Sequence, residues 1–263
     1  MSITAAIETR RRVIGALLSR EAKKRFGGNY VGLLTAFFEP LVQVAFFGLI
    51  FYATDRQGPH GASVFPFMLT GVLPFHLFSK IMTMGMSAID ANKTLLSYPV
   101  LKPVDTVIAR AILESLIYIM SFISLMVICL YLELIPEIAR FEYLFFAMLF
   151  ATCIGLGMGI LSAAVLSLSA SVKRFVPVVN RVLFLTSGVF FSASMIPQFA
   201  REYFLWNPML NITEMARYGT FQNYPPNYFN VPFILAVVVI SITAGLVVLH
   251  YAESNPKARI RGS

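Results

Sequence analysis

The chain has 263 residues, of which 57% are hydrophobic and 13% are charged, and its mean hydropathy is +0.74. A soluble domain is about half apolar and about a quarter charged, and a chain of this size has too little interior to cover the excess apolar surface. We therefore expect a membrane protein and exclude a cytosolic enzyme, a secreted disulfide scaffold and a disordered chain. The net charge of +8 indicates anchoring charges on the cytoplasmic side rather than nucleic-acid binding.

The first 28 residues predict an amphipathic helix that lies on the inner leaflet. Their apolar side chains recur near helical spacing, at Ile3, Ile7, Ile14, Leu17 and Leu18. Seven basic residues occupy other positions of the segment, and this combination is typical of interfacial helices. A basic helix that is simply solvated is the alternative. Gly27 and Gly28 are expected to end the helix.

Six apolar runs are each long enough to predict a transmembrane helix, which needs about 20 mostly apolar residues. They are Thr35–Ala53, Val64–Ala88, Val107–Leu134, Tyr143–Leu168, Val176–Ser194 and Val231–Tyr251. Their hydrophobicity does not alternate, which excludes the strands of an outer-membrane barrel. The sequence therefore predicts an all-α polytopic membrane protein, with residues 1–263 in one transmembrane domain.

The stretch 195–230 is too apolar for a plain loop and too interrupted for a span. Prolines divide it, at positions 197, 208, 225 and 226. We expect a re-entrant helical segment on the outer side, before the last span. Such backbone is tolerated at membrane depth only where it is buried in protein or lines a wet cavity.

The distribution of Lys and Arg predicts the orientation of the chain. With a cytoplasmic N-terminus, 14 of these residues fall on the inner side and 4 on the outer side. Because inner loops carry the excess of positive charge, six spans then place both termini in the cytoplasm.

Sequence motifs for enzyme chemistry are missing. Gly27 and Gly32 have the spacing of a phosphate-binding loop, but Leu33 and Leu34 stand where Lys and Ser or Thr are needed. We expect no ATP hydrolysis, no cofactor and no metal in this chain. The three glycines at 155, 157 and 159 lie within a span, where they predict close helix packing.

Charged residues within the predicted spans are functional candidates, because such charges are costly in a membrane. Lys80, Arg110 and Glu114 lie near the cytoplasmic face. In one interpretation Lys80 simply pairs with Glu114. In the other, an electropositive entrance for an anionic headgroup is formed by Lys80, Arg110, Arg174 and Arg181. Glu39 is expected to cap a helix or to pair with the basic N-terminal helix.

A series of short motifs resembles a known family. It consists of Gly71-x-x-Pro74-Phe75, Ala88-Ile89-Asp90-Ala91-Asn92, Lys102-Pro103-Val104-Asp105-Thr106, Ala109-Arg110, Glu114, and Trp206-Asn207-Pro208 followed by Glu214. The series resembles the membrane subunit of type-2 ABC exporters, and within that group the KpsM-like permeases of capsular polysaccharide export. The entry segment 25–40 also follows the family pattern, except at Val31 and Thr35.

The resemblance implies a homodimer of six-helix permeases bound to two copies of a separate P-loop ATPase, which would hold ATP and Mg. The implied cargo is a glycolipid-anchored acidic polysaccharide carried outward across a bacterial inner membrane. A periplasmic adaptor and outer-membrane export proteins would continue the path to the cell surface. The chain itself would be a transport subunit surrounded by lipid, neither an enzyme nor a nucleic-acid binder.

The loop 89–106 is short and is stiffened by Pro99 and Pro103. We expect Asp90–Tyr98 to form a coupling helix in a groove of the ATPase. The contacts with the ATPase are expected at Asp90, Asn92, Lys93, Leu95 and Tyr98. An ordinary cytoplasmic loop is the alternative.

On the outer side, aromatic rings are expected to contact the glycan beside two arginines. These residues are Arg201, Tyr203, Trp206, Arg217 and Tyr218. Tyr203 and Trp206 are equally typical of interfacial anchors.

Other functions remain open from the sequence. The chain fits a type-2 exporter of O-antigen, teichoic acid or a drug. A membrane-embedded glycosyl- or phosphotransferase needs clustered acidic residues, whereas Asp55, Glu133, Glu137 and Glu142 are scattered. A purely structural scaffold does not explain the embedded charges.

Overall fold

The computed structural model describes residues 3–27, 30–53 and 58–254, and these residues form helices and no strand. The α-helices are α1 (Ile3–Phe26), α2 (Tyr30–Ala53), α3 (Val64–Met86), α4 (Ala88–Ala91), α5 (Pro103–Tyr131), α6 (Phe141–Leu168), α7 (Val172–Thr186), α8 (Gln198–Phe204), α9 (Pro208–Thr220) and α10 (Val231–Ser254). The short 3-10 helices are η1 (Pro59–Gly61), η2 (Leu95–Ser97), η3 (Ala193–Met195) and η4 (Pro226–Tyr228). The predicted all-helical fold is confirmed.

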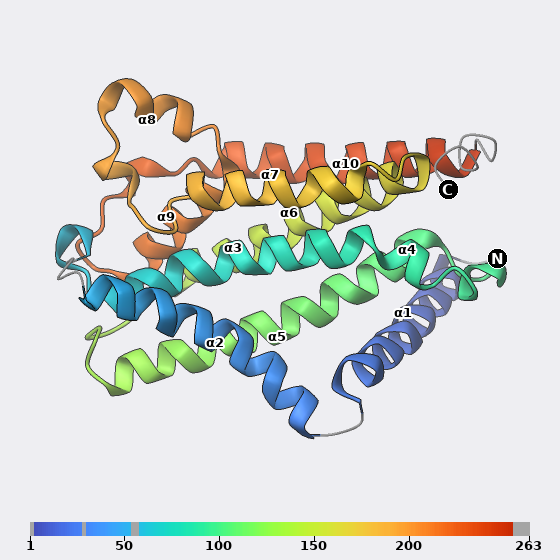
Figure 1. Ribbon diagram of the computed structural model, residues 1–263, viewed down its shortest axis with the longest axis horizontal. Coiled ribbons are helices and arrows are strands. Elements are labelled where there is room, and N and C mark those ends of the chain that lie inside the picture. The colour runs from blue at the N-terminus through green and yellow to red at the C-terminus, as the bar shows by residue number, and fades with distance from the viewer. Residues whose placement is uncertain (1–2, 28–29, 54–57, 255–263) are drawn as a thin grey trace.

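The helices form an elongated bundle around α3, which is buried along most of its length. It packs against α2, α5, α6 and α9, and α10 covers the other side of α6. Figure 1 shows α3, α5, α6 and α10 running along the long axis of the molecule. The beginning of α1 and the end of α10 lie at the same end of this bundle, whereas α8 lies at the opposite end.

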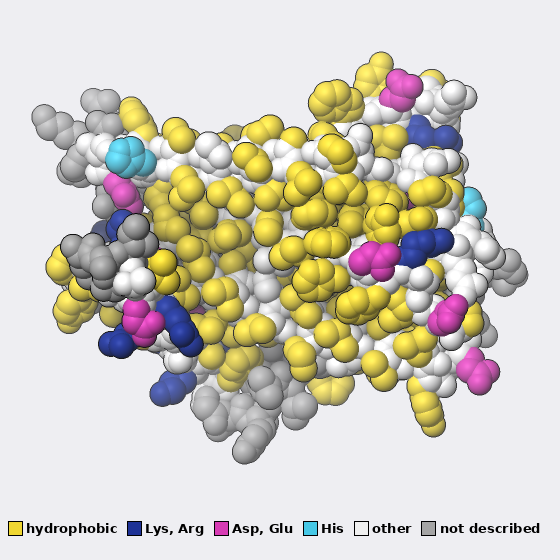
Figure 2. Space-filling view, turned by 180° about the vertical axis from the view of Figure 1, so that it is seen from behind, with side chains coloured by type: hydrophobic (Ala, Val, Ile, Leu, Met, Phe, Trp, Pro, Cys, Tyr) yellow, Lys and Arg dark blue, Asp and Glu magenta, His cyan; other side chains and the backbone are white. Residues whose placement is uncertain are grey.

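Four helical segments are long and apolar enough to cross a membrane: α3, α5, α6 and Pro226–Ser254, which contains α10. Apolar side chains cover a broad face of the molecule, and the charged side chains gather toward its two ends (Figure 2). The segment Pro226–Ser254 buries least of its length against the protein. These features define a polytopic membrane protein.

The first and fifth predicted spans are not among these four segments. Helix α2 has 24 residues, and its apolar stretch among the residues whose side chains are described is Phe38–Phe51. Helix α7 has 15 residues and ends at Thr186, eight residues before the predicted boundary at Ser194. It ends there because Gly188 adopts a φ of +67°. The chain after Gly188 then bonds to side chains of α9. The prediction of a helix up to Ser194 is therefore wrong.

The predicted helix at the N-terminus is present as α1. It ends at Phe26, and Gly27 follows with a φ of +60°; Gly28 lies outside the described residues. The apolar side of its second half contacts protein, since Leu17 is buried and Leu18 packs on Leu113 of α5. The position of α1 on the leaflet stays a prediction.

The interrupted stretch 195–230 forms α8, α9 and η4, with α9 almost entirely buried in protein. Asn207 caps α9 by accepting a bond from the backbone N–H of Met209 at 2.9 Å, and Pro208 occupies the first turn, where it is tolerated. The expected helical, proline-divided segment is thus confirmed at the level of secondary structure.

The glycines of α6 allow close helix contacts on two sides, as predicted. A Cβ at Gly155 would lie 3.1 Å from the Phe78 carbonyl oxygen of α3. A Cβ at Gly157 would lie 2.5 Å from the Ser241 Oγ of α10. Small residues that let helix backbones approach are a main source of packing between membrane helices.

Replacing Gly157 by Val should destabilise the chain, because α10 has to move away from α6. Overpacking of this kind costs about 1–3 kcal/mol. Thermal unfolding of the purified chain in detergent measures the effect. Gly15→Val in α1 is the matched control, because a Cβ there meets nothing within 4 Å. Equal melting temperatures for the two variants would contradict this packing.

Candidate functional site

The charged residues near the α1 end of the bundle form ion pairs between helices. The Lys80 Nζ lies 2.6 Å from the Glu39 Oε1 of α2, and Glu114 pairs with Arg25 of α1. The predicted pair between Lys80 and Glu114 is therefore wrong, because α1 and α2 each supply a nearer partner. Arg25 also lies 3.8 Å from Glu39, which confirms that Glu39 pairs with the basic helix.

A second group of polar contacts joins α1 to α3, α4 and α5. The Arg110 Nε lies 3.2 Å from Glu21, and its Nη1 donates to the Met84 carbonyl at 2.8 Å. Asn92 accepts a bond from Arg20 at 2.8 Å and donates to the Ala88 carbonyl at 2.9 Å. Sequence reasoning missed Glu21, although an acidic residue in a strongly basic helix was a signal for a specific partner.

The predicted coupling helix Asp90–Tyr98 consists of two short pieces, α4 and η2, separated by a turn. One continuous helix is not formed, because the Asn92 side chain bonds back to the α4 backbone and ends it. Asn92 is only 2% exposed, so it anchors the loop to α1 instead of reaching a partner.

The exposed part of the loop is polar and aromatic. Asp90 and Lys93 are exposed, Leu95 is half-buried, and Tyr98 is 62% exposed. Asp90 lies 3.6 Å from Lys173 at the start of α7, and Arg10 of α1 lies 2.5 Å from Asp105 at the start of α5. The loop therefore touches α1, α5 and α7 while presenting one face outward.

The four predicted entrance residues have different environments. Lys80 and Arg110 are neutralised by Glu39 and Glu21. Arg174 and Arg181 are exposed on one side of α7, and neither forms an ion pair with another described residue. The four predicted entrance residues therefore do not form one cluster of unpaired cations. The two arginines of α7 are the members of this set without an ion-pair partner among the described residues.

At the opposite end, Arg217 and Glu214 of α9 form an ion pair in which both side chains are completely buried. The guanidinium of Arg217 donates to the Gly188 carbonyl at 2.6 Å and to the Phe191 carbonyl at 2.8 Å. It lies 3.7 Å from the ring centre of Phe67 on α3. This pair therefore holds the turn after α7 between α9 and α3.

The acceptor side of this pair is also satisfied. Glu214 accepts bonds from the Tyr224 hydroxyl at 2.9 Å and from the Ala193 N–H at 3.0 Å. The Tyr224 hydroxyl also contacts the Ser192 Oγ at 2.7 Å. Burial raises the pKa of Tyr224, so its hydroxyl stays protonated as a donor. Sequence reasoning missed Tyr224, which lies in a proline-rich turn without a motif.

The two predicted outer arginines are not both open to a ligand. Arg217 is buried, and Arg201 is partly buried with its Nη2 2.9 Å from the Ile196 carbonyl oxygen. Tyr218 packs under Arg140 and against Tyr143. Tyr203 and Trp206 are 79% and 76% exposed, so these two aromatic residues remain available to a ligand.

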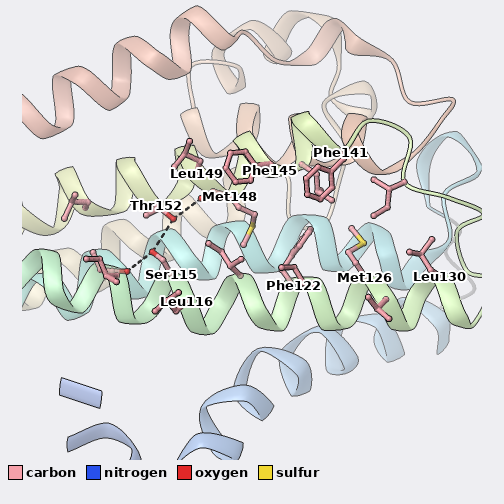
Figure 3. A pocket seen from close by; sticks show the side chains of 18 of the residues that line it. Ser115, Leu116, Phe122, Met126, Leu130, Phe141, Phe145, Met148, Leu149 and Thr152 are labelled. Carbon is pink, nitrogen blue, oxygen red and sulfur yellow. Dashed lines mark hydrogen bonds between the residues drawn. The ribbon is translucent and has the colours of Figure 1, made fainter. Parts of the chain in front are cut away.

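Among the described residues, two of the hollows are of a size to hold a ligand. One is a groove of about 410 Å³ between α5 and α6, where Ser115 and Thr152 are bonded to each other among apolar side chains such as Phe122 and Met148 (Figure 3). Because nearly its whole lining is apolar, this groove suits lipid and not a glycan. The other hollow, of about 330 Å³, lies beside Trp206.

The apolar helices, with charged side chains toward the two ends of the bundle, define a polytopic helical membrane protein. The ABC-2 type transporter family matches residues 12–221 of this chain. The chain belongs to this family.

Curated relatives resemble the chain over nearly its whole length. It is 30% identical to the polysialic acid transport protein KpsM of Escherichia coli, over 95% of this chain and 96% of the relative. It is 28% identical to the capsule polysaccharide export inner-membrane protein CtrC of Neisseria meningitidis, over 94% of each chain. Identity to the corresponding protein BexB of Haemophilus influenzae is 26%, over 90% of each chain.

Proposed function

We propose that this chain is the permease subunit of an ATP-driven exporter that moves a lipid-linked acidic capsular polysaccharide across the bacterial inner membrane. The observation that carries the proposal is the identity to KpsM, CtrC and BexB over at least 90% of the chain. The apolar helices α3, α5, α6 and α10 agree with a multi-pass membrane protein.

The energy for export comes from a separate ATPase, two copies of which bind the permease and hold ATP and Mg. The exposed face of the α4–η2 loop is the contact for this ATPase. Support for that assignment comes from Lys93 and Tyr98, which are exposed on a loop whose other side is fixed to α1 and α5. A periplasmic adaptor and outer-membrane proteins receive the polymer.

The functional unit is a homodimer in which α2 and α7 face the second copy or the path between the copies. Supporting this, Phe38, Val42 and Phe46 are exposed along one side of α2. Helix α7 buries no residue fully against its own chain. With α2 and α7 added to the four long spans, the chain crosses the membrane six times, with both termini in the cytoplasm and α8–α9 re-entrant from the outside.

The path for the anionic cargo runs along α7. Arg174 and Arg181 are seven residues apart on one side of this helix and are exposed. An unpaired arginine at membrane depth is costly unless it faces water or an anion. Nearby, Asn180 and His76 each bury a polar atom without a partner in the described structure, which favours a wet path beside them.

Deletion of the coding sequence in the source bacterium tests this function. The expected result is loss of polymer from the cell surface with glycolipid-linked polymer trapped inside the cytoplasm, and recovery when the gene is restored. An intact capsule in the deletion strain would contradict the proposal. If O-antigen were trapped inside the cell instead of capsular polymer, the chain would still be an export permease, but its cargo would be O-antigen.

Replacing Arg181 by Gln should slow export of the acidic polymer. A hydrogen bond to a charged group contributes about 1.5–3 kcal/mol, so binding of the anionic group should weaken about tenfold or more. The rate at which polymer appears on the surface measures the effect. Arg181→Lys is the matched control, which keeps the charge and should retain most of the rate. Equal rates for wild type and R181Q would remove Arg181 from the path.

A further inference from the structure

The second hollow, which we call the outer pocket, lies at the end of the bundle where α8 projects (Figure 1). Residues from α8, α9, η4 and the first turn of α10 line it. Its volume of about 330 Å³ falls at the lower end of the range of about 300–1,000 Å³ that is common for small-molecule sites. It is therefore large enough for a small ligand unit but not for a folded partner.

One wall of the outer pocket is aromatic. The ring centres of Trp206 and Phe233 lie 6.0 Å apart, at an interplanar angle of 80°. This edge-to-face contact is a favourable arrangement for aromatic pairs, and it orients the indole. Trp206 is nevertheless 76% exposed, so most of its surface is open to a ligand.

The polar residues of the pocket divide into structural and free groups. Asn211 is structural, because its Nδ2 donates to the Leu205 carbonyl at 2.7 Å and its Oδ1 accepts from the Asn230 N–H at 2.9 Å. Asn230 uses its Oδ1 to accept from the Phe233 N–H at 3.0 Å, and its amide NH₂ has no partner among the described residues. Glu202 and Asn227 are exposed, and neither has a partner among the described residues.

This set of groups matches one chemical class of ligand. A sugar ring has an apolar face of C–H groups, which packs on an aromatic ring, and hydroxyls that both donate and accept. Free amide and carboxylate groups supply the complementary donors and acceptors. Because Glu202 is the charged group in the lining, a sugar without a carboxylate is favoured over an acidic one.

We propose that the outer pocket binds a neutral pyranose unit of the exported glycan on the outer side of the membrane. The inference deepens the proposed function and rests on it for the identity of the cargo. The unit packs on Trp206, and its hydroxyls bond to Glu202, Asn227 and the amide of Asn230. The acidic units of the polymer are left to the arginines of α7.

The fluorescence of Trp206 tests the proposal directly, because Trp206 is the single tryptophan of the chain. The purified full-length chain in lipid nanodiscs is titrated with galactose, N-acetylglucosamine and the trisaccharide of N-acetylglucosamine. We expect a saturable change in emission with at least one of these neutral sugars, and a weaker response to N-acetylneuraminic acid. No response to any of them would overturn the proposal, as would a response to glycerophosphoglycerol alone, which would indicate a lipid headgroup site.

Substitutions of single residues test whether the sugar binds in the outer pocket or elsewhere on the surface. Asn227→Ala and Glu202→Ala each remove one bonding group and should weaken sugar binding about fivefold to tenfold. Phe199→Ala is the matched control, because Phe199 is 81% exposed on α8 but does not line the pocket. Equal binding by all three variants would overturn the proposal. Melting temperatures verify that each variant is folded.

The outcome is distinguishable from failure of the proposed function. If deletion of the gene traps polymer in the cytoplasm but Trp206 gives no response to sugars, the export function is supported and sugar binding in the outer pocket is contradicted. If the deletion leaves export intact while sugars still change the emission, the pocket binds sugar but the cargo assignment falls.

Discussion

Replacing Arg217 by Ala is expected to destabilise the chain more than any other single change considered above. The substitution leaves the Glu214 carboxylate completely buried without its cation, and removing one partner of a buried ion pair costs about 3–5 kcal/mol. It also removes the donors to the carbonyl groups of Gly188 and Phe191. We expect little protein in the membrane and a strongly lowered melting temperature in detergent.

Two further variants make this prediction specific. Tyr224→Phe removes one donor to Glu214 and should cost about 1–2 kcal/mol, which is clearly less than Arg217→Ala. The double variant Glu214→Leu with Arg217→Met removes both charges and should recover much of the lost stability. Arg11→Ala, at an exposed position of α1, is the control for loss of an arginine. Equal melting temperatures for R11A and R217A would contradict the buried pair.

The second large effect is expected at Asn92, where replacement by Leu should uncouple ATP hydrolysis from export. Asn92 fixes the α4–η2 loop to α1 through its bond with Arg20, and a hydrogen bond to a charged group contributes about 1.5–3 kcal/mol. Without this anchor, movement of the loop is no longer transmitted to the membrane spans. The amount of polymer exported per ATP hydrolysed by the complex should fall about tenfold or more.

The role of Asn92 as an anchor is tested from the other side of the same bond. Arg20→Ala removes the donor from α1 and should reproduce the defect of Asn92→Leu, whereas Arg11→Ala on the same helix should not. Normal export per ATP in N92L would contradict a coupling role for the loop. A defect in N92L with normal coupling in R20A would mean that Asn92 acts without Arg20, which leaves its bond to Glu21 of α1 at 3.3 Å as the anchor.

The sequence predicted those features that depend on local composition. The apolar runs of α3, α5, α6 and α10 were located, because a membrane helix needs length and apolarity, and both are visible in the residues. The end of α1 at Gly27 and the close packing at Gly155 follow from what a glycine permits locally.

The partner of Lys80 could not be predicted, because it depends on the register between helices. Glu39 and Glu114 both lie in the N-terminal half of their helices, and nothing in the neighbouring sequence tells which of them pairs with Lys80. The packing of α2 against α3 decides in favour of Glu39.

Arg217 was placed at the surface for a similar reason. A charged residue in a short, proline-bounded helix is usually exposed, and its burial here depends on carbonyl groups contributed by the turn after α7. Gly71 of α3 leaves room for it, since a Cβ there would lie 3.0 Å from the Arg217 Nη2. The motif that contains Gly71 is visible in the sequence, but the sequence does not show that Gly71 makes room for Arg217.

The source of the energy for transport can be measured directly. The purified chain is reconstituted in proteoliposomes with and without its partner ATPase, and ATP hydrolysis and movement of lipid-linked polymer are measured together. We expect the chain alone to hydrolyse no ATP and to move no polymer, and the addition of the ATPase to produce both activities. ATP hydrolysis by the chain alone, or ATP-dependent transport without the second subunit, would contradict this expectation.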